Sequence, residues 1–364
     1  MPAPRKERVA VGMSGGVDSS LAAALLLEAG YEVIGLTMAI WDPDMTLSVS
    51  GRSGCYGPGE KDDIAAAEAT ARRLRIDHHV VSLAGEYRDK VLEPFCTAYL
   101  SGCTPNPCAL CNPLMKFDLL PKKARAQGIL FDRFATGHYA RLQPPESGRG
   151  WRLLRGRDTR KDQSYFLARL SQEQLADVLF PLGAMTKDQV REEARRRGLQ
   201  TAAGRPESQD FFEGEDRGVL FAPGTVQPGP IVDTAGRQLG THRGLVYYTI
   251  GQREGLGIAA GKRLYVKEII AATNTLVVAE RTAALTSQCQ VRDFHWIAGV
   301  PPDAHRRLGV QCRYRHAPAE VQLQPLATDR WRLDFAEPQF AVAPGQMAVL
   351  YAGDEVLGGG WIVP

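Results

Sequence analysis

Short apolar runs alternate with amphipathic segments from residue 8 to about residue 140, and this alternation constrains the fold more than any other feature. The runs "RVAVGM", "YEVIGLTMAI" and "HHVVSL" have the character of strands, and the intervening "SSLAAALLLEAG" and "DDIAAAEATARRL" have helical spacing. The later run "FDRFATGHYARL" follows another helical segment and extends the pattern. Strands that alternate with helices are typical of a parallel α/β sheet, which we therefore expect here.

The rest of the chain has a different texture. "TKDQVREEARRRGL" predicts a helix with Thr186 as its N-cap. From about Phe221, glycine and proline punctuate short runs such as "RLYVKEIIAA", "TLVVAE" and "QMAVLYA". This spacing predicts small antiparallel sheets or a barrel.

Composition excludes several classes of protein. The chain has 364 residues, of which 44% are hydrophobic and 23% charged, so a packed core is expected rather than disorder. No stretch reaches the roughly 18 uncharged apolar residues of a membrane span, and the charged start runs into the first predicted strand rather than a cleavable signal. The seven cysteines, an odd number, do not resemble a secreted disulfide framework. We expect a cytoplasmic protein without a membrane partner; the net charge of +3 alone does not indicate a nucleic-acid partner.

The stretch "VAVGMSGGVDSSLAAALL" predicts a phosphate-binding loop. It leaves a strand, turns through two glycines and enters a helix, whose N-terminal N–H groups favour phosphate. Ser14, Ser19 and Ser20 add hydroxyl donors. The Gly-Lys-Ser/Thr of a Walker A loop is missing. Asp18 would repel phosphates unless it faces Mg²⁺, so the loop favours metal-bound ATP.

Six consecutive residues match Ser-Gly-Gly-x-Asp-Ser, which resembles the signature loop of the ATP pyrophosphatases. These enzymes split ATP into AMP and pyrophosphate while adenylating an oxygen. Further stretches narrow the resemblance to the tRNA-specific 2-thiouridylase family, over residues 8 to 361 and in the family's own order. They are "TPNPCALCNPLMKF", "ATGHYAR", "KDQSYFL", "RPESQDF", "YYTIGQREGLGI", "CRYRHAP" and "VAPGQMAVLYAGDEVLGGG".

The resemblance implies an adenine-nucleotide α hydrolase-like (ATP pyrophosphatase) domain over residues 1–221, a small central domain over 222–284 and a C-terminal β-barrel over 285–364. It implies adenylation of the C2 oxygen of the wobble uridine of tRNA, followed by displacement of AMP by sulfur. The implied ATP contacts are Gly12, Met13, Ser14, Gly15, Gly16, Val17, Asp18, Ser19, Met38 and Gly137. The tRNA contacts expected from these motifs are Asn106, Pro107, Cys108, His138, Lys161, Asp162, Gln163, Arg313, Tyr314 and Gln346.

Sulfur transfer needs a nucleophile that is active at neutral pH, which favours a cysteine whose pKa is lowered by a nearby cation. Cys111 aligns with the family's nucleophile, and Lys116 follows within about one helical turn if Pro113 opens a helix. The flanking proline and asparagine residues predict that Cys111 lies in an accessible loop.

Two positions depart from the family pattern. The family has a second cysteine in a segment that reads "ESQDFFEGE" here, and its place is taken by Phe212. The family commonly has Asp where this chain has Cys108. One thiol is lost and another gained, so the usual relay between two cysteines cannot operate in its usual form.

Two routes for sulfur remain open from the sequence. In the first, Cys108 and Cys111 are the catalytic pair, one carrying a persulfide and the other resolving it as a disulfide. In the second, Cys55, Cys108 and Cys111 hold a 4Fe-4S cluster whose open iron binds hydrosulfide. A structural zinc site is disfavoured because no second Cys-x-x-Cys or Cys/His pair accompanies the first. Either route needs a sulfur donor, a persulfide or a hydrosulfide.

Two other functions compete. One is a small-molecule ligase or amidotransferase of the ATP pyrophosphatase type, although no glutaminase is recognisable. The other is a non-catalytic tRNA-binding protein, which would not require an intact nucleotide loop.

Overall fold

The computed structural model describes residues 6–45, 54–146, 150–199, 210–214, 216–303, 307–327 and 329–364. The chain divides into two compact units, and each is described by itself. The first comprises Met1–Val91, Cys108–Glu215 and Asp354–Val356. The second comprises Leu92–Pro107, Asp216–Gly353 and Leu357–Pro364. Residues 207–209 of the altered family segment lie outside the described residues, whereas Phe212 lies within them.

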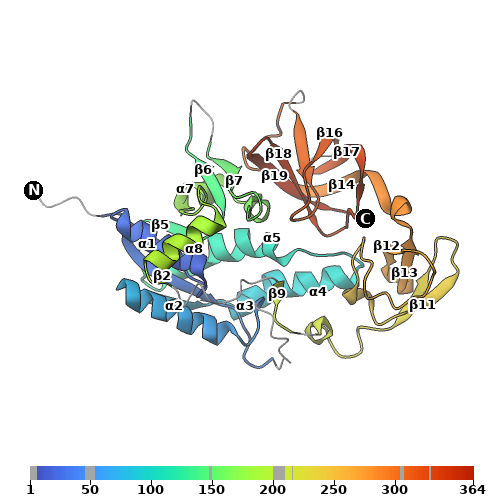
Figure 1. Ribbon diagram of the computed structural model, residues 1–364, viewed down its shortest axis with the longest axis horizontal. Coiled ribbons are helices and arrows are strands. Elements are labelled where there is room, and N and C mark those ends of the chain that lie inside the picture. Colours follow the sequence, from blue (N-terminus) through green and yellow to red (C-terminus); the bar gives the residue numbers. More distant parts are fainter. Residues whose placement is uncertain are drawn as a thin grey trace, which may run out of the picture. The chain divides into compact units, whose positions relative to one another are not determined.

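A five-stranded sheet forms the centre of the first unit, in the order β4-β2-β1-β5-β8. Its strands β2 and β5 are labelled in Figure 1. Every pair in it is parallel, which confirms the fold class that the strand–helix alternation predicted. The strands are β1 (Arg8–Gly12), β2 (Glu32–Ala39), β4 (His78–Ser82), β5 (Arg133–Thr136) and β8 (Val178–Leu179). The chain proceeds outward from β1 to β2 and β4, and then returns to β5 on the other side of β1. Ligands bind at such a switch point, beyond the carboxyl ends of the strands.

Helices alternate with these strands. They are α1 (Val17–Glu28), α2 (Glu60–Leu74), α3 (Ala84–Tyr87), α5 (Pro107–Cys111), α6 (Leu120–Ala126), α7 (Gln172–Asp177) and α8 (Lys187–Arg196). Of these, α1, α2 and α6 contact strands of the sheet. A π-helical segment, Asn112–Leu119, continues α5. Helix α1 is apolar almost all round and lies between the sheet and α8, where Val17 and Ala24 meet Ala194. Helix α8 begins with a capping box between Thr186 and Gln189, which confirms the predicted N-cap.

Shorter strands complete the first unit. β3 (Gly54–Tyr56) pairs in parallel with β9 (Asp210–Phe212). β6 (Ala140–Gln143) and β7 (Arg152–Arg155) form an antiparallel hairpin, and β7 also pairs with Glu355 and Val356.

The second unit holds helix α4 (Glu93–Leu100) and two β structures. The smaller is a four-stranded sheet in the order β11-β10-β13-β12. Its strands are β10 (Gly229–Val232), β11 (Gln238–His242), β12 (Tyr265–Ile270) and β13 (Thr275–Ala279). Its apolar core includes Ile231, Val266 and Leu276.

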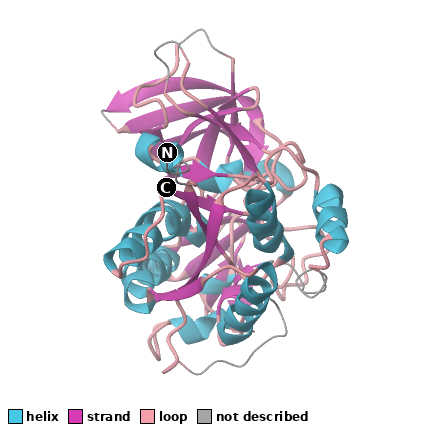
Figure 2. Cartoon of the chain, turned by 90° about the vertical axis from the view of Figure 1, so that its left-hand side faces the viewer, coloured by secondary structure: helices cyan, strands magenta, loops and turns pink. Residues whose placement is uncertain are grey.

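The larger β structure is a six-stranded barrel. Its strands are β14 (Leu285–Trp296), β15 (Leu308–Gln311), β16 (Ala319–Ala327), β17 (Arg330–Phe340), β18 (Met347–Ala352) and β19 (Glu355–Ile362). The order is β14-β17-β16-β15-β18-β19, and β14 also pairs with β19, which closes the barrel. In Figure 2 it stands out as a strand-dominated body, whereas helices surround the parallel strands. The predicted C-terminal barrel is therefore confirmed.

No helix in the described part of the chain is both long enough and apolar enough to span a membrane.

Candidate functional site

The nucleotide loop lies between β1 and α1, at the carboxyl end of β1 and beside the switch point. Gly15 has a φ of 72°, a left-handed conformation that glycine adopts without strain. Gly16 is the N-cap of α1 and makes no side-chain hydrogen bond to the helix. The first N–H groups of the helix therefore have no capping partner from Gly16. These N–H groups and the positive end of the helix dipole suit phosphate.

The loop is held from within and from both neighbouring strands. The Ser19 hydroxyl accepts from the N–H of Ser14 at 3.2 Å and donates to the carbonyl of Gly16 at 3.2 Å. Met13 is bonded to β2 through its N–H and through the hydroxyl of Thr37. Gly137, just after β5, lies so close that a Cβ there would be 2.8 Å from the backbone of Asp18 and Ser19. Only glycine fits at position 137 without moving the loop.

The carboxylate of Asp18 is engaged by two side chains that sequence reasoning missed. The ammonium of Lys187, the first residue of α8, donates to both carboxylate oxygens at 2.8 and 2.9 Å. The Tyr139 hydroxyl donates to Oδ1 at 2.8 Å. Lys187 and Tyr139 are only 3% and 2% exposed. Their separation from Asp18 along the chain, 169 and 121 residues, left no local signal.

His138 and Met38, two other predicted contacts, lie near the same edge of the sheet. Met38 is the penultimate residue of β2 and is partly exposed. His138 follows β5, and a hydrogen bond of 2.8 Å joins its Nδ1 to the hydroxyl of Thr136. Burial and, secondarily, the charge of Lys116 hold the pKa of His138 well below its usual value. The imidazole is therefore neutral at physiological pH.

Three thiols gather near the buried phenol of Tyr87. Burial raises the pKa of Tyr87, and the nearby thiols of Cys111, Cys55 and Cys108 add to that effect. Cys55 is exposed on β3, while Cys108 and Cys111 are partly exposed. The ring of Tyr56, which follows Cys55, stacks on Tyr87 with centroids 5.4 Å apart. The three thiols that the sequence singled out therefore all lie close enough to Tyr87 to act on its pKa.

Two expectations for Cys111 are wrong. Cys108 and Cys111 lie in helix α5 rather than in a loop, because Pro107 opens a helix that the π-helical segment continues. The Cys111 side chain is only partly exposed, and the burial of its thiol raises its pKa to about 11. Lys116 acts in the opposite direction but does not offset the burial. The resting thiol is therefore protonated at neutral pH.

The predicted cluster site is not borne out, and the charge of Asp18 already has a partner. Both carboxylate oxygens of Asp18 accept from Lys187, whose ammonium balances that charge. Within the described ranges, no three His, Cys, Asp or Glu side chains are grouped so that they could hold a metal ion. We therefore derive no step through a metal on Asp18 or through a cluster on Cys55, Cys108 and Cys111.

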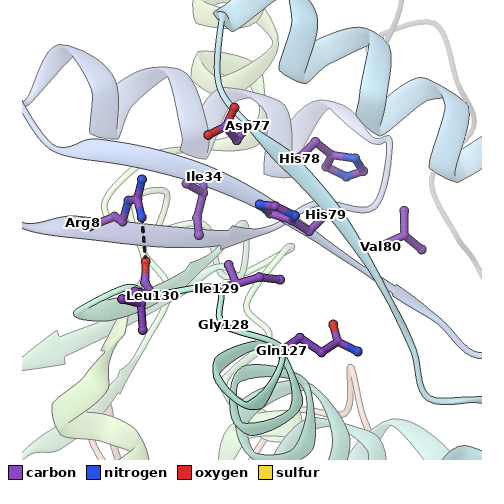
Figure 3. Close-up of a pocket in the computed structure, with 10 residues that line it drawn as sticks. All are labelled: Arg8, Ile34, Asp77, His78, His79, Val80, Gln127, Gly128, Ile129 and Leu130. Atoms are coloured by element: carbon purple, nitrogen blue, oxygen red, sulfur yellow. Dashed lines mark hydrogen bonds between the residues drawn. The ribbon is translucent and has the colours of Figure 1, made fainter.

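A surface pocket of about 530 Å³ lies elsewhere, at the amino edge of the sheet (Figure 3). Arg8 at the start of β1, His78 at the start of β4 and the Gln127–Leu130 turn line it. Arg8 donates to the carbonyl of Leu130 at 3.2 Å and pairs with Glu32. The nucleotide loop is at the carboxyl edge, so we do not place the substrate in this pocket.

Comparison with known proteins identifies the family. Three family models match: a tRNA methyl transferase HUP domain over residues 7–212, a tRNA methyl transferase PRC-barrel domain over 219–280 and an aminomethyltransferase beta-barrel domain over 286–362. Proteins named tRNA-specific 2-thiouridylase MnmA match over nearly the whole chain. That of Trichormus variabilis is 46% identical over 360 residues, 98% of each chain.

The chain belongs to the tRNA-specific 2-thiouridylase family. The family member of Synechococcus sp. is 45% identical over 99% of this chain and 93% of its own. That of Magnetococcus marinus is 44% identical over 98% and 99%.

Family membership draws attention to the residues expected to contact tRNA. In the "KDQ" segment of the first unit, buried Asp162 accepts from the N–H groups of Gly156 and Ser164 and pairs with Arg155. Gln163 accepts from the N–H of Tyr139 at 3.0 Å. Gln163 thus holds the backbone of Tyr139, and Asp162 holds that of Gly156 and Ser164, whereas Lys161 is only half-buried.

The remaining candidates for tRNA contact lie mainly in the second unit. Gln346 is 8% exposed and donates to the carbonyl of Thr104 at 2.8 Å, so it holds the segment that leads to Asn106 and Pro107. Arg313 and Tyr314 follow β15 and are partly exposed. Phe212, which stands where the resemblance implied a cysteine, is 5% exposed and lies opposite Tyr56 in the β3–β9 pair.

Proposed function

We propose that this protein catalyses ATP-dependent 2-thiolation of the wobble uridine of tRNA. Two features support the proposal together. The chain is about 45% identical to 2-thiouridylases along its whole length, and the nucleotide loop and the Cys108–Cys111 helix belong to one compact unit. That identity is the observation that carries the proposal.

The first half-reaction is adenylation. The N–H groups of the loop and of the first turn of α1 hold the phosphates of ATP, and Gly137 keeps the loop in place. The C2 oxygen of the uridine attacks the α-phosphorus, forming an O–P bond and releasing pyrophosphate. The C2 oxygen, a poor leaving group by itself, now carries AMP and can leave as part of it.

The second half-reaction transfers sulfur. A donor persulfide passes its outer sulfur to Cys111, and the donor leaves as a thiol. The outer sulfur on Cys111 then attacks C2, and the C2–O bond breaks to release AMP. Cys108, one turn away on α5, attacks the sulfur of Cys111, which leaves 2-thiouridine and a Cys108–Cys111 disulfide. An external dithiol reduces the disulfide and restores the enzyme.

The proposal extends to the surroundings of the enzyme. Its substrate and sulfur donor are tRNA and a persulfide carrier, and we place the reaction in the cytoplasm. His138, Lys161, Arg313 and Tyr314 remain the proposed tRNA contacts, through stacking, phosphate pairing and base edges. Because the three thiols, all in the described part of the chain, do not form a metal site, the proposal takes the sulfur from the persulfide carrier, and iron analysis of the purified protein checks this.

The test incubates the protein with ATP and unmodified tRNA and measures AMP. Release of AMP that requires tRNA with a wobble uridine supports thiolation. Turnover without tRNA but with a small acceptor would instead identify a ligase, and no turnover at all would identify a binding protein.

A further inference from the structure

The nucleotide loop carries a negative charge where it must receive negative phosphates. Asp18 is in the first turn of α1, and its side chain is 31% exposed. Like charges a few ångströms apart repel strongly when they are partly removed from water. Something must neutralise this carboxylate before the loop can bind ATP.

Lys187 is placed to do so. Its ammonium lies between the two oxygens of Asp18, at 2.8 and 2.9 Å, and its side chain is 3% exposed. The hydroxyl of Tyr139 adds a third hydrogen bond, to Oδ1 at 2.8 Å. The carboxylate thus accepts from one cation and one neutral donor.

The backbone of Lys187 is held as firmly as its side chain. Its N–H donates to Asp158 at 3.0 Å, and Asp158 also accepts from the N–H of Arg160 at 3.1 Å. The preceding Thr186 caps helix α8, and α8 packs against α1. The ammonium therefore reaches Asp18 from a rigid base, which suits a fixed countercharge rather than a mobile phosphate ligand.

We infer that Lys187 is the positioning residue of the nucleotide loop: it neutralises Asp18 and ties α1 to α8 so that the loop can accept ATP. This role deepens the proposed function. It rests on one part of that function, the binding of ATP by the loop. Lys187 touches Asp18 rather than the reacting atoms, so its effect falls on ATP affinity. The carboxylate is an anchor for the lysine and not a metal ligand.

The test uses three variants of the full chain: Lys187→Met, Asp18→Asn, and the two combined. Methionine keeps the length of the lysine stem without its charge. Lys123→Met is the matched control, since Lys123 forms an ion pair with Glu86 that does not involve the loop. Thermal unfolding identifies any variant that fails to fold. If a single variant fails, the double variant can still be measured, because it leaves neither charge unpaired.

ATP affinity is measured directly, by equilibrium dialysis without tRNA, at several Mg²⁺ concentrations. We expect Lys187→Met to weaken ATP binding about tenfold or more, because Asp18 then repels the phosphates. The double variant should bind ATP at least about threefold more tightly than Lys187→Met, since removing the carboxylate removes the repulsion. The control should stay within about twofold, and the KM for tRNA should be unchanged in all four proteins.

Two results would overturn the inference. One is a double variant that binds ATP no better than Lys187→Met. The other is an Asp18→Asn variant whose only defect is a higher Mg²⁺ requirement, as expected of a lost metal ligand. Because ATP binding is read without tRNA, these results do not depend on whether the protein thiolates tRNA, which AMP release tests separately.

Discussion

The acidity of Cys111 has a direct kinetic consequence. Burial raises its pKa to about 11, so only about one thiol in a thousand is ionised at pH 8, from the difference of three units. A thiol with a pKa near 9 would be about one-tenth ionised at the same pH. Because the thiolate is the reactive form, Cys111 should be alkylated about a hundred times more slowly than such a thiol of equal accessibility.

Pulse alkylation with iodoacetamide measures this reactivity. Folded protein and free glutathione in the same tube are treated briefly at a series of pH values, and peptide mass spectrometry quantifies the label on Cys111. We expect the rate at Cys111 to rise about tenfold per pH unit up to about pH 10, without levelling off.

Substitution of Lys116 tests the cause. Lys116 lowers the pKa of Cys111, against the larger effect of burial. Lys116→Met should therefore move the curve to still higher pH, and Lys123→Met should leave it unchanged. A rate that levels off near pH 7 or 8 in the unmodified protein would refute the reasoning, since it would indicate a thiolate stabilised in the resting site.

Three further predictions address the loop, the buried imidazole and the sulfur route. Gly137→Ala should weaken ATP binding about tenfold in dialysis, because its Cβ would lie 2.8 Å from the loop backbone; Gly85→Ala, with open space around it, should not. The pKa of His138 is lowered in the folded protein, so the contribution of His138 to stability is present above about pH 6.5 and is lost as the pH falls towards the folded pKa. In denaturant titrations at a series of pH values, His138→Gln should make the fall in the free energy of unfolding less steep. An unchanged slope would contradict this role of His138. Protein purified without oxygen should contain substoichiometric iron, lack absorbance at about 400 nm and thiolate tRNA with sulfur from a persulfide donor. Activity that required iron would contradict this prediction and favour a cluster.

The parts of the fold that the sequence predicted are those with local patterns. Neighbouring residues specify the strands β1 and β2 and the glycine turn at Gly15, so local sequence predicts them. The closure of the barrel by β14 and β19 is a long-range pairing, and only the family resemblance predicted a barrel rather than open sheets.

The chemistry of the site was less predictable, because it depends on burial and on distant partners. Nothing near Lys187 in the sequence indicates that it pairs with Asp18, 169 residues away. The flanking prolines of Cys111 suggested an accessible loop, yet Pro107 opens a helix in which burial raises the pKa of the thiol. Charge spacing predicted a lowered pKa, and burial, which spacing does not reveal, reversed it.

Nucleoside analysis shows whether the protein thiolates the wobble uridine. Unmodified tRNA is incubated with the protein, ATP and a persulfide donor, then digested and analysed by mass spectrometry, with AMP measured in parallel. The account predicts one 2-thiouridine per AMP released with a wobble uridine, and neither product when that position is cytidine. AMP released equally with the cytidine tRNA, or without any 2-thiouridine, would contradict it.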